Sequence, residues 1–257
     1  MRSKAHTASK PIRRVISANG CSGVAAPFER LYVAARGAAR FSLHAAGTSG
    51  HTSLVREPGV VNAIDVLTDA IARLRERMPV LREPPHPIHG AADLIVVGVE
   101  GGRGWGVVPS GARADVEIRV VPGTSRPALE AQVAEALDGS GVRVEHAPGT
   151  LRWVEPSAVD ADAPIVRAAA RAWTDVLGAA PTLGCFPGGT DGRSLTERGI
   201  PTIPGLGPGT LLRAHGPDEH VAVAELVTAA QIYALAAHAF LLDDVTTQGE
   251  PYVQHRA

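Results

Sequence analysis

The chain has 257 residues, of which 45% are hydrophobic and 20% are charged, and its formal net charge is −1. This composition is typical of a soluble globular protein with one large domain or two small ones. A net charge near zero argues against nucleic acid or a membrane surface as a partner, and we expect no apolar run of membrane-spanning length. Two cysteines, Cys21 and Cys185, predict no disulfide framework and favour a reducing, cytoplasmic compartment.

The N-terminal segment is basic and is not followed by the apolar stretch of a secretory signal, so we expect a disordered leader over residues 1–23. Regular patterns begin near residue 38, where alternating apolar side chains predict a half-buried strand. The elements predicted in this region are a strand at 39–47, an amphipathic helix at 60–78, strands at 94–102 and 112–123, a helix at 125–137 capped by Ser125, and a strand at 142–147.

This order, β-α-β-β-α-β, is that of the ferredoxin-like split βαβ arrangement. Four strands with two helices on one face make a compact module of about 100 residues, which is large enough to fold alone. We therefore predict a separate domain over residues 36–149. The proline-rich stretch at 83–90 is expected to be a loop within it, because proline lacks the backbone N–H that regular structure uses.

A second unit follows, whose helices and short strands predict an α/β layer. Its elements are a helix at 162–178 closed by Gly178, a strand at 181–186, a helical segment ending at Gly199, a strand at 200–205, and a long apolar helix at 221–245. Two short strands make a thin sheet, so this unit resembles half of a larger α/β domain. We assign residues 24–35 and 150–245 to it and expect a tail at 246–257.

The loop from Pro187 to Val221 is turn-rich, ends near His215, and precedes the long apolar helix, which is a place where a metal ligand can sit. A zinc centre needs several ligands. The nearby segment 215–220 is one residue too long for the helical H-x-x-E-H motif, and Pro217 argues against a helix interior. His215 is therefore either one contributor to a larger metal site or a solvated loop histidine.

Two glycine-rich loops, 188–193 and 205–209, lie close together in the sequence and predict either plain turns or a surface whose backbone N–H groups bind a carboxylate or phosphate. The glycines at 102–106 lie between strands and do not form a dinucleotide fingerprint. His51 is either a surface histidine or a functional one. Arg119 is either a strand residue in an ion pair or a ligand-binding cation.

Four motifs together resemble the co-catalytic zinc aminoacylase and peptidase family, which includes acetylornithine deacetylase, succinyl-diaminopimelate desuccinylase, carboxypeptidase G and aminoacylase. The motifs occur in order over about residues 24–240 and read ARGAARFSLHAAGTSGHTSLVREPGVVNAI, GWGVVPSGARADVEIRVVPG, GGTDGRSLTERGIPTIPGLGPG and AHGPDEHV. The resemblance implies an α/β catalytic domain with an inserted α+β lid that forms a homodimer. It also implies two zinc ions per site and a small carboxylate-bearing substrate.

The resemblance gives roles to particular residues. His215 matches the last zinc ligand, and His51 matches the lid histidine that reaches the partner subunit's active site and stabilises the tetrahedral oxyanion. Arg119 matches an arginine that binds the substrate carboxylate. The remaining matches form the wall around the carboxylate end of the substrate or orient it, and they are Gly189, Thr190, Asp191, Arg193, Gly207 and Gly209.

Departures from the family pattern lie mostly at the metal centre. The family's other ligands come from a His-x-Asp, a bridging Asp, a Glu-Glu pair that includes the base, and an acidic residue before a proline, whereas this chain has no His-x-Asp and no Glu-Glu. Ala26 stands before Pro27 in place of that acidic ligand, and Gly106 replaces the family asparagine. Because loss of the base alone removes a factor of about 10²–10⁴, we expect no hydrolysis by this chain alone.

Three interpretations remain at this point: a zinc-dependent hydrolase of N-acyl amino acids or small peptides, a non-catalytic dimerisation or substrate-binding remnant, and one half of a split enzyme. A nucleotide-binding protein is disfavoured because no phosphate-loop fingerprint follows a strand. The first half of the family's catalytic domain is not recognised in the chain. We therefore expect uncovered apolar surface, with poor solubility or an N-terminal catalytic fragment as an added partner.

Overall fold

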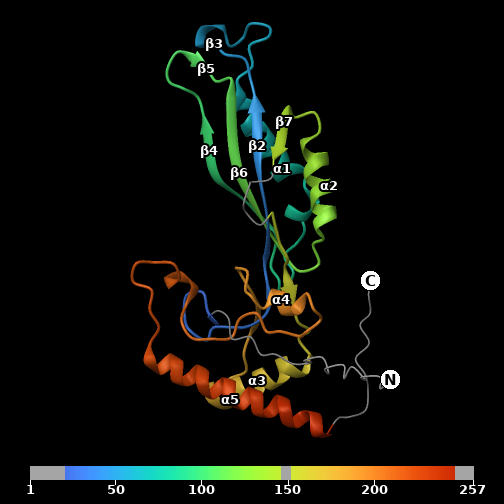
Figure 1. The fold of residues 1–257 in the computed structure, drawn as a ribbon, viewed down its shortest axis with the longest axis vertical. Helices are drawn as coiled ribbons and strands as arrows, with labels where there is room; N and C mark the ends of the chain where they lie inside the picture. Colours follow the sequence, from blue (N-terminus) through green and yellow to red (C-terminus); the bar gives the residue numbers. More distant parts are fainter. Residues whose placement is uncertain (1–20, 146–151, 247–257) are drawn as a thin grey trace, which may run out of the picture. The chain divides into compact units, whose positions relative to one another are not determined.

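The computed structural model describes residues 21–145 and 152–246, which form two compact units (Figure 1). The larger unit comprises Ala34–Ser157 and Gly184–Gly189, and the smaller one comprises the residues up to Val33, Ala158–Leu183 and the chain from Thr190 onward. The predicted leader and tail lie almost entirely outside the described residues.

An antiparallel sheet in the order β4-β6-β2-β7 forms the centre of the larger unit. Its elements follow one another along the chain as predicted, alternating β-α-β-β-α-β apart from two short strands at one end. They are β2 (Gly37–Ala46), α1 (Ala63–Arg77), β4 (Asp93–Gly101), β6 (Gly111–Val120), α2 (Arg126–Leu137) and β7 (Val142–Glu145). The short strand β8 (Trp153–Val154) also pairs with β2.

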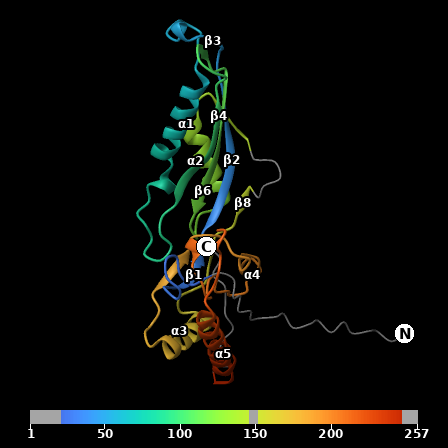
Figure 2. The ribbon, with the colours of Figure 1, turned by 90° about the vertical axis from the view of Figure 1, so that its left-hand side faces the viewer.

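Both helices start at capping residues and pack on the same face of this sheet (Figure 2). The Asn62 side chain accepts a hydrogen bond from the N–H of Ile64, which explains why α1 begins later than the predicted residue 60. Ser125 caps α2 as predicted, by accepting from the N–H of Ala128. The core between helices and sheet contains Phe41, Leu43, Leu67, Leu74, Val116, Ile118, Leu129 and Val133, all buried.

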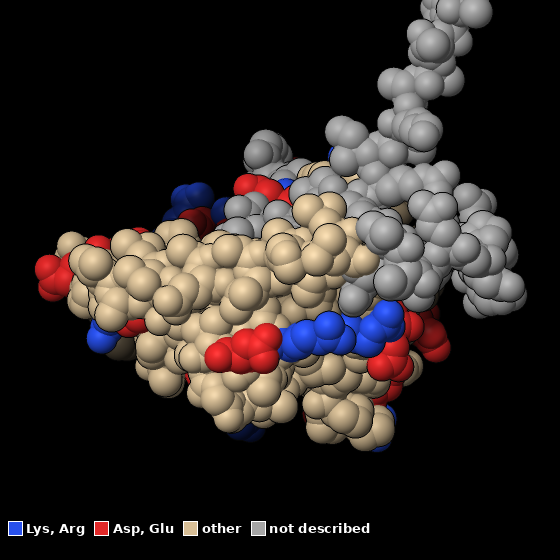
Figure 3. All heavy atoms as spheres, turned by 90° about the horizontal axis from the view of Figure 1, so that it is seen from below, with Lys and Arg blue, Asp and Glu red and all other residues tan. Residues whose placement is uncertain are grey.

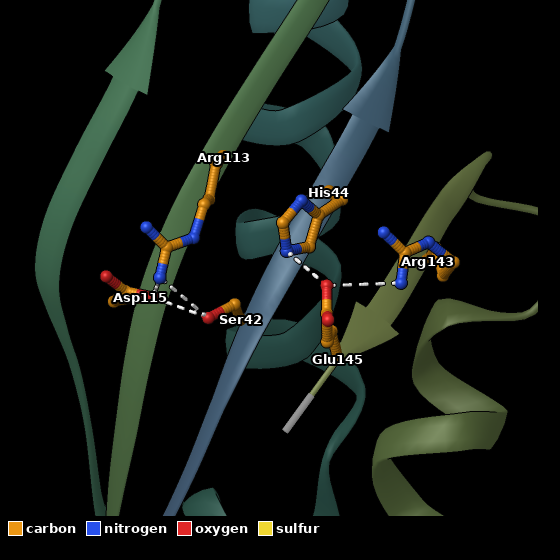
Figure 4. A network of polar contacts seen from close by, with 6 residues as sticks. All are labelled: Ser42, His44, Arg113, Asp115, Arg143 and Glu145. Carbon is orange, nitrogen blue, oxygen red and sulfur yellow. Dashed lines mark hydrogen bonds and ion pairs between the residues drawn. The ribbon is translucent and has the colours of Figure 1, made fainter. Parts of the chain in front are cut away.

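Polar side chains cover the other face of the sheet, because side chains alternate between the two faces of a strand (Figure 4). Ser42 donates a hydrogen bond of 2.5 Å to Asp115, which also pairs with Arg113 at 2.7 Å. On the β7 side, Nε2 of His44 lies 3.0 Å from a carboxylate oxygen of Glu145. At the opposite edge, β4 leaves apolar side chains exposed at Ile95, Val97 and Val99.

The smaller unit contains α3 (Pro164–Leu177), the single turn α4 (Arg193–Thr196), the 3₁₀ turn η3 (Leu211–Arg213) and α5 (Val223–Thr246). The strands β1 (Leu31–Ala35), β9 (Ser157–Ala158) and β10 (Leu183–Phe186) pair in the order β10-β1-β9, and the division between the two units passes through all three strands. Gly178 ends α3 with φ +78°, as predicted from its place after the apolar pattern.

Three expectations for this unit are corrected by the structure. The predicted strand at 200–205 is absent, apart from an isolated bridge between Gly205 and Tyr32, because Pro201 and Pro204 remove backbone donors. The helical segment ending at Gly199 is only the turn α4. Strand β1 was not predicted, because its five consecutive buried residues show no alternation.

Helix α5 carries much exposed apolar surface. It packs against α3, and its buried residues include Ala229, Ile232 and Ala236. Contrary to the expectation from the sequence, Val223–Leu242 is long and apolar enough to cross a membrane by length and composition, although a core helix of a soluble protein has the same properties. Figure 3 shows one face of the molecule, on which tan atoms surround a short row of charged side chains. The exposed large side chains of α5 are Val223, Leu226, Val227, Leu235, Leu241 and Leu242.

The proline-rich segment after the 3₁₀ turn η2 (Pro79–Leu81) forms a tight turn around two stacked histidines. The rings of His86 and His89 lie 4.1 Å apart, and Nδ1 of His86 accepts from the N–H groups of Ile88 and His89. Burial, and then the charge of His86, lower the pKa of His89 below its ordinary value of 6.5.

We therefore expect this turn to lose stability as the pH falls below about 6.5, because His89 then binds more protons in the unfolded chain than in the folded turn. The exchange rate of the Gly90 amide, whose N–H bonds to the carbonyl of His86, should rise at pH 5 beyond the intrinsic pH effect. A His89→Phe variant keeps a stacked ring without a titrating group and should weaken that response. Equal responses in the two proteins would contradict the assignment to His89.

Candidate functional site

His51 lies at one end of the larger unit, where β3 (Gly50–His51) pairs with β5 (Val107–Val108) and the 3₁₀ turn η1 (Thr52–Leu54) follows. Its Nδ1 accepts a hydrogen bond of 3.2 Å from the N–H of Ser53 and lies 2.8 Å from the Ser53 hydroxyl oxygen. Since the backbone N–H can only donate, the neutral ring carries its proton on Nε2. The exposed side chain can thus offer an N–H donor to an oxyanion.

Gly47 fixes the loop that leads to His51, and its importance was not recognised from the sequence. A Cβ atom at this position would lie 2.4 Å from the carbonyl oxygen of Val61, 2.7 Å from the nitrogen of Ala63 and 2.8 Å from the carbonyl oxygen of Pro109. The Gly47 N–H also donates to the carbonyl of Ser110. Only glycine permits this close approach of three backbone segments.

Arg119 lies on β6, on the face opposite the helices, and the ion pair considered for it from the sequence is present. Its Nε lies 2.6 Å from one carboxylate oxygen of Glu117, while the other oxygen receives Nε of Arg40 at 2.6 Å. Among the described residues, the terminal nitrogens of Arg119 have no further ion-pair partner. These two nitrogens remain free to form bidentate hydrogen bonds with a carboxylate.

The first glycine-rich loop follows β10, and the division between the two units falls between Gly189 and Thr190. Arg193 folds back on its own turn, where its guanidinium donates to the carbonyl of Thr190. The Thr190 hydroxyl is buried and has no hydrogen-bond partner among the described residues. Burying a hydroxyl group without a hydrogen-bond partner costs free energy of folding. The Thr190 hydroxyl is therefore the unusual feature of this loop.

The second glycine-rich loop already uses the backbone groups that we expected to face a substrate. The N–H of Gly209 donates to a carboxylate oxygen of Glu225 at 2.8 Å, and the carbonyl of Gly207 accepts from both the N–H and the hydroxyl of Ser22. Gly209 has φ +81°, a conformation that favours glycine. The loop does bind a carboxylate, but the carboxylate belongs to α5.

His215 has a left-handed backbone, with φ +62°, in an exposed loop. Such a conformation costs a non-glycine residue about 1–2 kcal/mol and is concentrated at functional sites. The His215 N–H donates to a carboxylate of Glu219 at 2.9 Å, which holds the loop closed. The neighbouring His220 is also fixed locally, because its Nδ1 lies 2.6 Å from the carbonyl oxygen of Asp218.

The segment around Ala26 lies beside the loop that leads to His215. The carbonyls of Gly23 and Val24 accept hydrogen bonds from the N–H groups of Leu211 and Leu212. Glu29 is the acidic group of this segment, and its carboxylate accepts from the N–H groups of Ala25 and Val24, which lower its pKa. Glu29 therefore closes the turn with its carboxylate.

The residues present do not fit a two-zinc centre. Within residues 21–145 and 152–246, no three His, Cys, Asp or Glu side chains are grouped as metal ligands. Thr190, Arg193, Gly207, Gly209 and His215 lie in the smaller unit, whereas His51, Arg119 and Gly189 belong to the larger one. The described geometry thus gives each candidate a local environment but no complete metal site.

The comparisons with known proteins place this mixed α/β chain in a peptidase family. The model of Peptidase family M20/M25/M40 matches residues 20–239, and the chain belongs to this family. Aminoacylase-1 of Homo sapiens is 27% identical over 196 residues, which are 73% of this chain and 47% of that protein. The chain thus spans about half the length of the curated relatives it matches.

Solved structures show the same fold. The aminopeptidase PepT from Bacillus cereus superposes with a TM-score of 0.64 and 22% identity, covering 89% of this chain and 57% of that chain. The dipeptidase Dug1p from Saccharomyces cerevisiae gives a TM-score of 0.62 at 14% identity, covering 88% and 59%. Both chains are considerably longer than the segment they share with this one.

Proposed function

We propose that this chain carries the lid and the C-terminal catalytic segment of a zinc-dependent hydrolase that cleaves the amide bond of N-acyl amino acids or small peptides. The match to the peptidase family over residues 20–239 carries the proposal. In this proposal His215 is the last ligand of a zinc centre, Arg119 binds the substrate carboxylate, and Gly189, Thr190 and Arg193 support that end of the substrate. Zinc would supply an activated water and polarise the carbonyl when bound.

In this proposal His51 donates a hydrogen bond to the oxyanion, the role that its geometry suits best. With Nδ1 held by the Ser53 N–H, the Nε2 proton can stabilise the oxyanion that forms when the amide carbonyl is attacked. A single donor of this kind contributes a factor of about 10²–10³ to kcat. The left-handed backbone of His215 supports its functional assignment, because an exposed loop gives no packing reason for that strain.

The chain alone is proposed to be inactive, because the described residues hold no group of three His, Cys, Asp or Glu side chains and the sequence has no Glu-Glu pair to supply a general base. We expect the purified chain to bind zinc substoichiometrically and to leave N-acetyl amino acids intact. Metal analysis and a ninhydrin assay for released amino acid check both points. Two tightly bound zinc ions together with turnover would show that the proposal of inactivity is wrong.

A complementing N-terminal catalytic fragment would restore the activity of a split enzyme but not that of a remnant. The exposed apolar side chains of α5 support such a partner, because large apolar patches mark interaction surfaces. The neighbouring DNA distinguishes the two alternatives, since a reading frame encoding His-x-Asp and Glu-Glu favours a split enzyme. In a reconstituted enzyme, His51→Ala should lower kcat by a factor of about 10²–10³.

We also propose that the protein is located in the cytoplasm.

The larger unit is proposed to be the ferredoxin-like lid through which two copies of the chain dimerise. Its strand order β4-β6-β2-β7 with two helices on one face supports this assignment, and β4 is an edge strand with exposed Ile95, Val97 and Val99. An unpaired apolar edge can continue its sheet into a second copy.

We therefore expect the chain to sediment as a dimer and Val99→Glu to shift it toward monomer, because the substitution places like charges at the paired edges. Analytical ultracentrifugation over a concentration series measures this shift. Val223→Glu, at an apolar position on α5 that is also exposed, serves as the matched control. A monomeric parent chain, or dissociation caused only by the control, would contradict dimerisation through β4.

A further inference from the structure

A pocket of about 150 Å³ lies within the larger unit, between α2 and the edge of the sheet. It arises because β2 changes its pairing partner along this edge. Ser42 to Ala45 pair with β7, whereas Ala38 and Ala39 pair with β8. The change leaves space beside Phe41, on the face that α2 covers.

The walls of this pocket are apolar and partly aromatic. Phe41 comes from β2, Val144 from β7 and Trp153 from β8, while Leu129 and Val133 face them from α2. Of these, Phe41, Leu129 and Val133 belong to the buried core. A mostly apolar pocket of roughly this volume has room for a molecule of about the size of benzene.

The charged groups at the pocket are neutralised by one another. Glu130 lies 2.6 Å from Arg152 and 2.9 Å from Arg126, and Arg40 pairs with Glu117 at 2.6 Å. A charged ligand would have to break one of these pairs or lose its hydration against apolar walls. An uncharged ligand avoids both costs, and the rings of Phe41 and Trp153 favour a flat aromatic one.

We infer that this pocket is a binding site for a small, uncharged aromatic molecule, separate from the residues assigned to amide hydrolysis. Occupation would link α2 to both strands that share the edge of β2. We therefore also expect that binding of the aromatic molecule slows the separation of β7 and β8 from β2. It does not depend on the proposed function, because all of its walls belong to the larger unit.

The experiment uses 5-fluoroindole as the probe and the full chain. Line broadening of the probe in ¹⁹F NMR reports binding, and unlabelled indole should compete for it. Ala134→Leu extends a side chain into the pocket and should weaken binding by roughly tenfold or more, because leucine and the probe overpack the same space. Ala131→Leu, an exposed alanine of the same helix that does not line the pocket, is the matched control and should bind as the parent does.

Methyl chemical shifts provide a second measurement that does not depend on how the variants fold. In the parent chain, the probe should shift the methyl signals of Val133 and Val144 and leave those of Leu235 on α5 unchanged. Broadening that persists in Ala134→Leu, or shifts confined to α5, would assign the binding to nonspecific apolar surface and overturn the inference. Absence of broadening up to the solubility limit of the probe would overturn it as well, and tight binding of 4-fluorobenzoate instead would overturn the uncharged class.

Discussion

Replacing Leu43 with alanine is expected to lower the free energy of unfolding of the larger unit by about 2–5 kcal/mol, through lost apolar burial and the cavity left behind. Leu43 is fully buried on β2, a central strand of the sheet, with β6 on one side and β7 on the other. Its neighbours in register are Ala114 and Val144. Neither can move to fill the space without disturbing its own strand.

Native-state hydrogen exchange at amides of β2 and β6 measures this loss for the larger unit alone, which matters because the chain has two units. Val97→Ala is the matched control, since Val97 is 63% exposed at the irregular position of β4 and should cost less than about 0.5 kcal/mol. A loss below about 1 kcal/mol for Leu43→Ala would show that the core around β2 collapses more readily than its packing indicates.

The second large effect is expected from Gly47→Ala. The new Cβ would lie within 2.8 Å of three backbone atoms, at Val61, Ala63 and Pro109, so the segments that they belong to must move apart. We expect a loss of stability near the upper end of the 1–3 kcal/mol that overpacking costs, because backbone cannot yield as a flexible side chain does. The loop carrying His51 should be displaced as well.

Gly50→Ala is a sharp control for this prediction, since its Cβ would meet only a methyl group of Val60 at 4.0 Å. Thermal unfolding and the amide shifts of His51 and Val107, which pair between β3 and β5, measure the two effects. We expect both to change strongly for Gly47→Ala and little for Gly50→Ala. Similar results for the two variants would mean that the crowding at Gly47 is relieved without cost.

Periodicity was a good guide wherever one face of an element is buried. The alternation of Phe41, Leu43 and Ala45 predicts β2, and the caps at Ser125 and Gly178 are recognisable as local signals. The signal fails where burial is complete or where proline intervenes. Strand β1 is buried throughout and shows no alternation, and the expected strand at 200–205 contains two prolines.

For the candidate site, too, one part could be predicted from the sequence and another part could not. The motifs identify His51, Arg119 and His215, because the types of residue and their order along the chain are written in the sequence. The orientation of His51 depends on its hydrogen bond with the Ser53 N–H, and the N–H of Gly209 is taken by Glu225, which lies sixteen residues away. The contact of Gly209 with Glu225 follows from no local sequence pattern.

The amino-acid sequence by itself therefore determined the family, the order of the elements and the residues that can take part in chemistry, since these depend on local preferences and on motif identity. Only the tertiary structure decided which backbone groups remain available, where a pocket opens between α2 and the edge of the sheet, and that α5 leaves apolar side chains exposed. These features arise from contacts between segments far apart in the chain, and their energies depend on distances that the sequence does not contain.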